Sequence, residues 1–396
     1  MTSPTKPLYL LLATQFLVTF SLMVLIPVLP LYLEQLGDQQ AVSGFYSALA
    51  LSAPAVGALF SAPLVGMLGD RYRYKNIFVV ALVLFVLSLL GMAWFESITL
   101  FIGARFLLGL SGIGVVLTLF FSRATIAPQG HQLGMQQQAI SLACLLGPLV
   151  GGYSLQTIGM DTVLAVTAGV TVSCLLALMW LLDKDVLQPQ ISESRQRPVN
   201  KCRFSTQIWS WLIAGALSQA GAFALVVGFA LYMTQQWPSS NVASQIGVIH
   251  ALAWCGTFAL AGFWGRRNAG GFGAQSFALG ALGCGLSVML IDFVSSLWLI
   301  AILRIIQGGF FATQSQSLFL QVSTLSPAEQ QGQALGCAKS AQVVGQLVGP
   351  FAAAFCFAHF GASSVLWLTA GLFIAAAILV SFLLSVQQVN FKVKTQ

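Results

Sequence analysis

The chain has 396 residues, of which 57% are hydrophobic and only 7% are charged, and its mean hydropathy is +0.86. About a quarter of the residues in soluble domains are charged, so these values exclude a soluble globular protein and indicate a polytopic membrane protein. The formal net charge is +7. What this charge means depends on which loops contain the lysines and arginines.

Twelve apolar segments follow one another along the chain, each long enough to cross a bilayer as a helix of about 20 residues. They cover residues 8–33, 43–69, 76–95, 98–121, 134–158, 162–182, 208–234, 241–264, 273–291, 297–320, 332–358 and 362–386. The first segment is too long for the apolar core of a signal peptide, and no small-residue cleavage site follows it. We therefore predict an all-α membrane protein with twelve transmembrane helices.

Lysine and arginine lie on one side of this arrangement. The bases of the alternate loops and termini are Lys6, Arg71, Arg73, Lys75, Arg123, Lys184, Arg195, Arg197, Lys201, Arg203, Arg266, Arg267, Lys392 and Lys394. The opposite loops contain none, which predicts that both termini are cytoplasmic in a multi-pass protein of the inner or plasma membrane. The net charge then reflects orientation, and a nucleic-acid partner has no support.

The sequence is duplicated. Leu133, Gly134, Gly147 and Pro148 recur 202 residues later, Arg105 and Gly109 recur 199 later, and Gly66, Gly69 and Arg71 recur 196 later as Gly262, Gly265 and Arg267. The longest polar interval divides the two copies. We predict an N-terminal six-helix half at 1–182, a cytoplasmic linker at 183–207 and a C-terminal six-helix half at 208–396.

The turn after the second segment reads Gly66-Met-Leu-Gly-Asp70-Arg71-Tyr-Arg-Tyr-Lys75. Small residues at helical spacing allow another helix to approach closely, and an acid at a helix end can stabilise the N-terminus of a neighbouring helix. The alternative is that the turn is merely basic, as cytoplasmic loops are. The order Gly-x-Leu-x-Asp-Arg resembles the cytoplasmic loop motif of the major facilitator superfamily.

That resemblance implies that Asp70 and the bases around it form a latch between the two halves, which opens during the conformational switch. The sequence departs from the motif at Arg73, where the family has a glycine. In the second copy Arg266 stands where the acid belongs. We therefore expect the first half to carry the latch, with Asp70 near the start of the eleventh helix at Gly332.

A base lies inside the fourth helix, in the run Arg105-Phe-Leu-Leu-Gly109. At 1.5 Å per residue its charge is about 10 Å below the outer surface, where a base is costly and indicates a lined cavity. Snorkelling to the surface is the alternative, and the recurrence of the base as Arg304 weighs against it. The run resembles the Arg-Phe-x-x-Gly motif of the same superfamily, which implies that Arg105 takes part in proton coupling.

The fifth helix contains Gly147-Pro148-Leu-Val-Gly151-Gly152, and the eleventh repeats Gly349-Pro350. Proline removes a backbone donor and bends a helix, so a packing kink is one interpretation. The run is also similar to the Gly-Pro-x-x-Gly-Gly signature of drug and metabolite antiporters in the superfamily. That resemblance implies an exporter in which these residues form a hinge.

Polar side chains recur at helical spacing on five of the predicted helices. We expect them to line a substrate cavity: Gln15, Gln219, Trp254, Arg304, Gln307, Gln314, Lys339 and Gln342. Glutamines also commonly bond across a helix interface, which is the alternative for each. No acid lies mid-membrane, so the predicted cavity is cationic. His250 is the candidate for the titrating group, because histidine titrates closest to neutrality.

No enzymatic constellation, metal-ligand spacing or Gly-Lys-Ser/Thr phosphate loop is present in the sequence, and we expect no cofactor. We predict a monomeric, proton-coupled exporter that works by alternating access and whose partners are the lipid bilayer, protons and a small molecule. The charge balance favours an anionic or zwitterionic substrate, such as a carboxylate siderophore or metabolite. A multidrug efflux antiporter, an uptake symporter or uniporter, and a non-transporting membrane sensor stay open.

Overall fold

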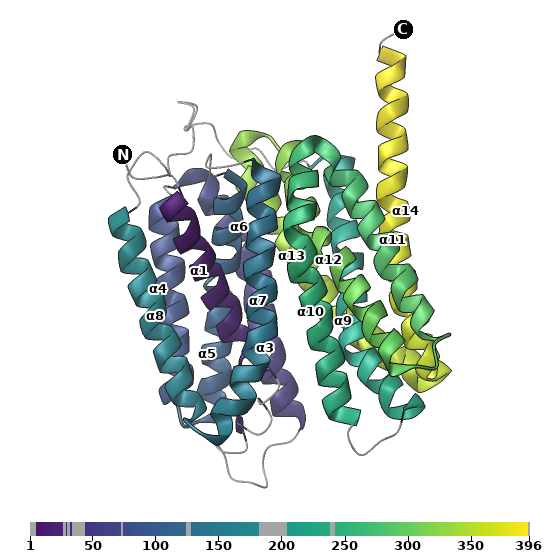
Figure 1. Cartoon of the computed structure of the whole chain (residues 1–396). Coiled ribbons are helices and arrows are strands. Elements are labelled where there is room, and N and C mark those ends of the chain that lie inside the picture. The colour runs from purple at the N-terminus through teal and green to yellow at the C-terminus, as the bar shows by residue number, and fades with distance from the viewer. Residues whose placement is uncertain are drawn as a thin grey trace. The chain divides into compact units, whose positions relative to one another are not determined.

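The computed structural model describes residues 5–26, 29, 32–33, 44–72, 74–123, 128–181, 204–237 and 242–394, which are almost all helical (Figure 1). The helices are α1 (Thr5–Met23), α3 (Gly44–Arg71), α4 (Tyr74–Trp94), α5 (Ile98–Leu110), α6 (Ile113–Arg123), α7 (Gln129–Gln156), α8 (Met160–Leu181), α9 (Thr206–Gln236), α10 (Val242–Arg267), α11 (Gly273–Ile291), α12 (Leu297–Leu325), α13 (Gln331–Phe360) and α14 (Ala362–Lys394). No strand occurs within these ranges.

Each of the twelve predicted segments coincides with helix in the described part of the chain. Among the described residues, nine mainly helical stretches are long and apolar enough to cross a membrane. One of them, Gln245–Ile291, contains two predicted segments, and Leu8–Met23 and Met160–Cys174 are shorter apolar helices that account for the first and sixth. The all-α prediction is therefore confirmed.

The fourth predicted segment is not one continuous helix. It breaks between α5 and α6 at Gly112, whose φ of 64° lies in the left-handed region. A Cβ at this position would lie 2.5 Å from Val65 Cγ2, so both the backbone conformation and the neighbouring helix require glycine here. The prediction missed the break because a single glycine in an apolar run is equally compatible with a continuous transmembrane helix.

Two compact units make up the chain. The first contains Met1–Pro128, Ala139–Lys201 and Glu329–Gly336, and in it α3 packs on α5 while α4 packs on α5 and α8. The predicted linker at 183–207 lies mostly outside the described residues. The first unit also includes the start of α13, up to Gly336. The division of the chain at 182 and 208 stays a prediction.

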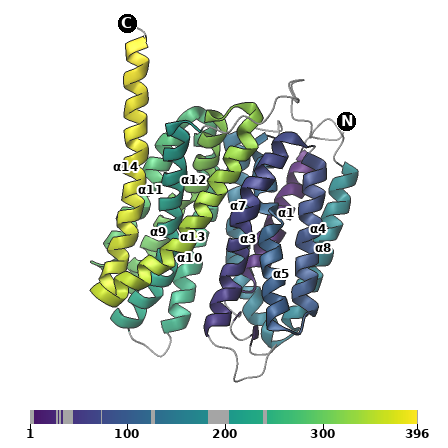
Figure 2. The same cartoon turned by 180° about the vertical axis from the view of Figure 1, so that it is seen from behind.

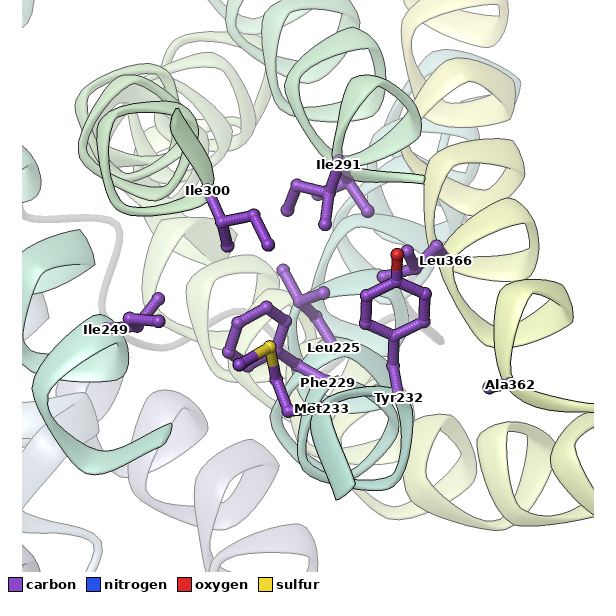
Figure 3. Packing of buried hydrophobic residues seen from close by; sticks show 10 residues of the cluster. Leu225, Phe229, Tyr232, Met233, Ile249, Ile291, Ile300, Ala362 and Leu366 are labelled. Atoms are coloured by element: carbon purple, nitrogen blue, oxygen red, sulfur yellow. The ribbon is translucent and has the colours of Figure 1, made fainter. Parts of the chain in front are cut away.

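The second unit contains Gln129–Gln138, Cys202–Ala328 and Cys337–Gln396. In it α12 packs on α10 and α11, and α14 packs on α9 and α11, as Figure 2 shows from behind. An apolar cluster fills the space between these helices. Figure 3 shows Leu225, Phe229 and Met233 of α9 directed toward Ile291 and Ile300 of α11 and α12.

Matching helix crossings relate the two halves. An added Cβ at Gly109 of α5 would overlap the Pro54 carbonyl of α3, and one at Gly308 of α12 would overlap the Ala253 carbonyl of α10. Gly308 lies 199 residues after Gly109, and Ala253 lies 199 residues after Pro54. Close approach of this kind requires glycine at the crossing. The α3–α5 and α10–α12 pairs are therefore two copies of one packing unit.

This register corrects the predicted offset of 196 for the turn after the second segment. An added Cβ at Gly66 would overlap the Gly332 carbonyl, and one at Gly265 would lie 3.0 Å from the Gly130 carbonyl oxygen. Gly66 therefore corresponds to Gly265 rather than to Gly262. The counterpart of Asp70 is then Ala269, not Arg266. The glycines three residues apart in both copies had allowed a match that was shifted by nearly one turn.

Candidate functional site

Arg304 of α12 is the centre of a buried polar cluster in the second unit. The side chain is 4% exposed, its Nη1 donates to Gln307 Oε1 at 2.7 Å, and its Nη2 donates to His250 Nδ1 at 2.9 Å. The guanidinium carbon lies 5.3 Å from the centre of the Phe229 ring. Every partner is neutral in this arrangement, because a nitrogen that accepts from a guanidinium must carry a lone pair.

Four helices position this cluster. Arg304 and Gln307 are three residues apart and so share one face of α12. The crossing at Gly308 brings α10, and with it His250, against α12. Phe229 of α9 meets the His250 ring edge-on at 5.4 Å between centroids, and the Cys284 thiol of α11 donates to the Gln307 carbonyl at 3.4 Å.

No carboxylate pairs with Arg304 among the described residues of its unit, and its Nε is buried without a hydrogen-bond partner there. Asp292, the described acid at the end of α11, instead accepts from Ser363 and from the indole of Trp367. An uncompensated charge in a medium of low dielectric is costly, so intramembrane bases mark ligand or ion sites. This cluster is our candidate site.

A second polar group joins α9 and α13 to α12. Ser315 Oγ accepts from Gln342 Nε2 at 2.9 Å and from Gln219 Nε2 at 3.4 Å. The two glutamines that the sequence suggested are thus brought together through a serine that it did not suggest. Trp254 and Lys339 are half-buried on α10 and α13.

Gln314 has a different environment from the one expected of a cavity residue. It is 1% exposed, donates to the Phe277 carbonyl of α11 at 3.2 Å and accepts from the Ser218 hydroxyl of α9 at 3.0 Å. These bonds correspond to the alternative interpretation of a glutamine that joins helices. Gln15 in the first unit is likewise buried and donates to Thr19 one turn along α1, at 3.0 Å.

Arg105 is the counterpart of Arg304 in the first unit and is 2% exposed. Its Nε donates to the Ala50 carbonyl of α3 at 2.6 Å. At the offset of 199, His250 corresponds to Leu51 and Gln307 corresponds to Leu108. The two arginines therefore occupy equivalent positions, and the second one alone has an imidazole and an amide at the matching places.

The predicted latch region brings the end of α3 to the start of α13. Added Cβ atoms at Gly66 and Gly336 would overlap the carbonyls of Gly332 and Ala62 respectively, so the helices cross there without room for side chains. Arg71 is exposed and Lys75 is half-buried. The side chain of Asp70 lies outside the described structure, so its role as a latch stays a prediction.

The predicted hinge glycines also lie at helix crossings. An added Cβ at Gly151 would overlap the Val24 carbonyl at the end of α1, and one at Gly147 would lie 2.7 Å from Met23 Cβ. In the second copy, a Cβ at Gly349 would overlap the Ala220 carbonyl of α9. Pro148, Gly152 and Pro350 lie within the same helices, α7 and α13. The crossings exist in both copies, and a hinge motion about them stays a prediction.

The sequence did not signal three members of these clusters. Phe229, Cys284 and Ser315 are ordinary apolar or small residues of transmembrane helices, and their roles arise only from contacts with other helices. The sequence did signal the other members of the Arg304 cluster: the recurrence of the base pointed to Arg304, helical spacing to Gln307 and titration near neutrality to His250.

The model of the Major Facilitator Superfamily matches residues 11–277 and again residues 243–395, which together cover nearly the whole chain. The protein belongs to the major facilitator superfamily. Its two matches overlap, as expected for a fold built from two copies of one six-helix unit. Proteins of this superfamily carry small molecules through the membrane and are not enzymes.

Superfamily members of similar sequence include transporters that are named for different substrates. The staphyloferrin B transporter of Staphylococcus aureus is 26% identical over 350 residues, which cover 86% of this chain and 84% of that protein. The multidrug resistance protein MdtG of Salmonella choleraesuis is 26% identical over 378 residues, 92% and 91% of the two chains. These relatives include both a siderophore transporter and a multidrug transporter.

Two solved superfamily structures share the fold. The human organic anion transporter MFSD10 has a TM-score of 0.79 with 18% identity, over 96% of this chain and all of that one. FucP in the outward conformation has a TM-score of 0.77 with 15% identity, over 96% and 99% of the two chains. These likenesses confirm the predicted twelve-helix transporter fold.

Proposed function

We propose that this superfamily member exports a small anionic or zwitterionic molecule, such as a carboxylate siderophore or metabolite, from the cell by proton-coupled alternating access. The observation that carries the proposal is Arg304, a buried base without a carboxylate partner among the described residues of its unit. An anion supplies the missing charge, whereas a cation meets a field of the same sign. The siderophore transporter among the relatives supports the same substrate class.

The remaining residues take roles in this proposal according to where they lie. Arg304, with His250 beside it, binds the substrate and senses protons, and Lys339 adds a second base on α13. Arg105 couples transport to protons in the first half. The crossing of α3 and α13 at Gly66 forms part of the cytoplasmic closure that Asp70 stabilises, and the crossings at Gly147 and Gly349 guide the hinge motion.

Transport into membrane vesicles tests the proposal. An exporter with both termini in the cytoplasm accumulates an anionic solute in energised inverted vesicles, and a protonophore abolishes the accumulation. Uptake by a symporter or uniporter instead fills right-side-out vesicles, and a sensor moves solute in neither.

Multidrug efflux is the second candidate function, supported by the relative MdtG. It predicts that inverted vesicles accumulate lipophilic cations such as ethidium in preference to organic anions. Ethidium accumulation without accumulation of any carboxylate would overturn the anionic proposal, because the charge of Arg304 opposes a cation.

A further inference from the structure

The hydrogen bonds of Arg304 leave one edge of its guanidinium half filled. A guanidinium binds a carboxylate in bidentate fashion with two parallel N–H groups, and Nε with Nη2 forms such an edge. In this structure Nη1 is taken by Gln307, Nη2 is taken by His250, and Nε has no partner among the described residues of its unit. The edge that would best hold a carboxylate is therefore occupied on one side by a neutral ring nitrogen.

The contact between Arg304 and His250 also fixes the protonation of the ring. Nδ1 accepts from Nη2 at 2.9 Å, so its lone pair is in use and it cannot carry a proton. A protonated His250 would place two cations at hydrogen-bond distance. The hydrogen bond from Arg304 and protonation of the His250 ring therefore exclude one another.

We propose that a carboxylate takes the Nε–Nη2 edge of Arg304, and that His250, displaced from Nη2, takes up one proton from solvent at Nδ1. The carboxylate replaces a bond to a neutral acceptor with two bonds to an anion, which are the stronger kind. The freed Nδ1 then lies beside an anion, which favours the imidazolium. His250 is half-buried whereas Arg304 is 4% exposed, so the displaced ring is the more accessible of the two.

The groups around His250 allow this exchange. Arg304 faces it from α12, and the Cys284 thiol of α11 reaches the pair only through Gln307. From α9 the ring meets Phe229, whose apolar cluster contains the Tyr232 phenol. No acid of the described residues in this unit bonds the pair. An incoming carboxylate is therefore the anion that can stabilise a proton on His250.

Linkage then sets the sign of the coupling. If anion binding promotes proton uptake, proton binding must strengthen anion binding by the same factor. Anion and proton bind together, which is opposite to the exchange that the antiporter signature in α7 implies. This step rests on the proposed export. An inside-negative membrane drives net negative charge outward, so export with one proton requires a substrate with at least two negative charges, such as a dicarboxylate or tricarboxylate.

Calorimetry on the purified full-length protein tests the proposal with tartrate, whose carboxyl groups stay ionised between about pH 6.5 and about pH 8. Titration in two buffers with different ionisation enthalpies gives the protons taken up for each tartrate bound. We expect uptake of up to one proton, and an affinity that rises by up to about tenfold for each unit that the pH falls in this range. Wild-type binding without proton uptake would overturn the coupling.

Three variants separate the parts of the mechanism. His250→Gln keeps an acceptor for Arg304 but cannot titrate, so we expect it to bind tartrate without proton uptake and without pH dependence. Arg304→Gln should lose binding altogether. His359→Gln removes an exposed histidine of α13 and should retain the wild-type proton uptake. Proton uptake that persists in His250→Gln refutes the role of His250, whereas ethidium binding with no tartrate binding refutes the proposed anionic substrate itself.

Discussion

The same substitution should have opposite effects on stability at two glycines of the first unit. In Gly151→Ala, the new methyl group would overlap the Val24 carbonyl oxygen and would lie 2.9 Å from the carbonyl carbon. These atoms are backbone, so they cannot swing aside as the end of a side chain can. Overpacking of this kind costs about 1 to 3 kcal/mol of the free energy of unfolding.

Gly169 of α8 provides the matched control, because an added Cβ there meets no atom within 4 Å. Replacing glycine by alanine at an open helix position raises the free energy of unfolding by about 1 kcal/mol, because it lowers the conformational entropy of the unfolded chain. The two variants should therefore differ by about 2 to 4 kcal/mol in the free energy of unfolding. Reversible unfolding in mixed micelles measures the difference, with transport in vesicles as a second measurement.

The larger Gly147→Leu should abolish transport, because its Cβ alone would lie 2.7 Å from Met23 Cβ and 3.1 Å from the Val24 nitrogen. If Gly151→Ala is as stable and active as Gly169→Ala, α1 does not cross α7 at this point in the working protein. The interpretation of the Gly-Pro signature as a close crossing would then be wrong.

Three further substitutions test separate parts of the proposal. Asp70→Asn should slow vesicle transport at normal expression, because an anion near the first turn of α13 gains about 0.3 to 1 kcal/mol from the helix dipole; unchanged flux excludes the latch. Arg105→Gln should allow substrate to move down its own gradient while abolishing accumulation driven by protons, and equal loss of both would argue for a structural role. Gln314→Leu removes the acceptor of the buried Ser218 hydroxyl and a donor to the Phe277 carbonyl, so it should lower the free energy of unfolding by about 1 to 3 kcal/mol without changing substrate preference; a changed preference would return Gln314 to the cavity.

The number of spans could be predicted from sequence because a backbone in lipid must satisfy its own hydrogen bonds, so each crossing needs one long apolar helix. The breaks within those helices could not. Gly112 and Gly114 are both glycines in the fourth segment, and the first adopts a positive φ while the second is helical. Their surroundings also differ, since a Cβ added at Gly112 would lie 2.5 Å from Val65 Cγ2 of a neighbouring helix, whereas one at Gly114 would meet no atom within 4 Å.

The candidate site was predictable in its charges and in several of its polar residues, but not in how those residues contact one another. Two buried arginines at matching places are visible in the sequence, since a base in an apolar run has few structural uses. Gln307 lies on α12 with Arg304, whereas Phe229 and His250 come from α9 and α10, and their contacts with Arg304 depend on how each helix is rotated. Helical spacing predicted that Gln314 lines the same cavity as Arg304, yet α12 has neighbours on several sides, and Gln314 lies at its interfaces with α9 and α11.

The duplication separates what the scaffold requires from what one copy added. Both copies keep the crossing glycine, Gly109 or Gly308, and both place a buried arginine one turn before it. A base that served only packing would have similar surroundings in each copy, but Leu51 and Leu108 are replaced by His250 and Gln307 in the second. Arg105 donates to a main-chain carbonyl that cannot titrate, whereas Arg304 donates to a ring that can. Arg105 is therefore suited to act as a charge with a constant partner, and Arg304 is suited to act as a charge whose partner changes during transport.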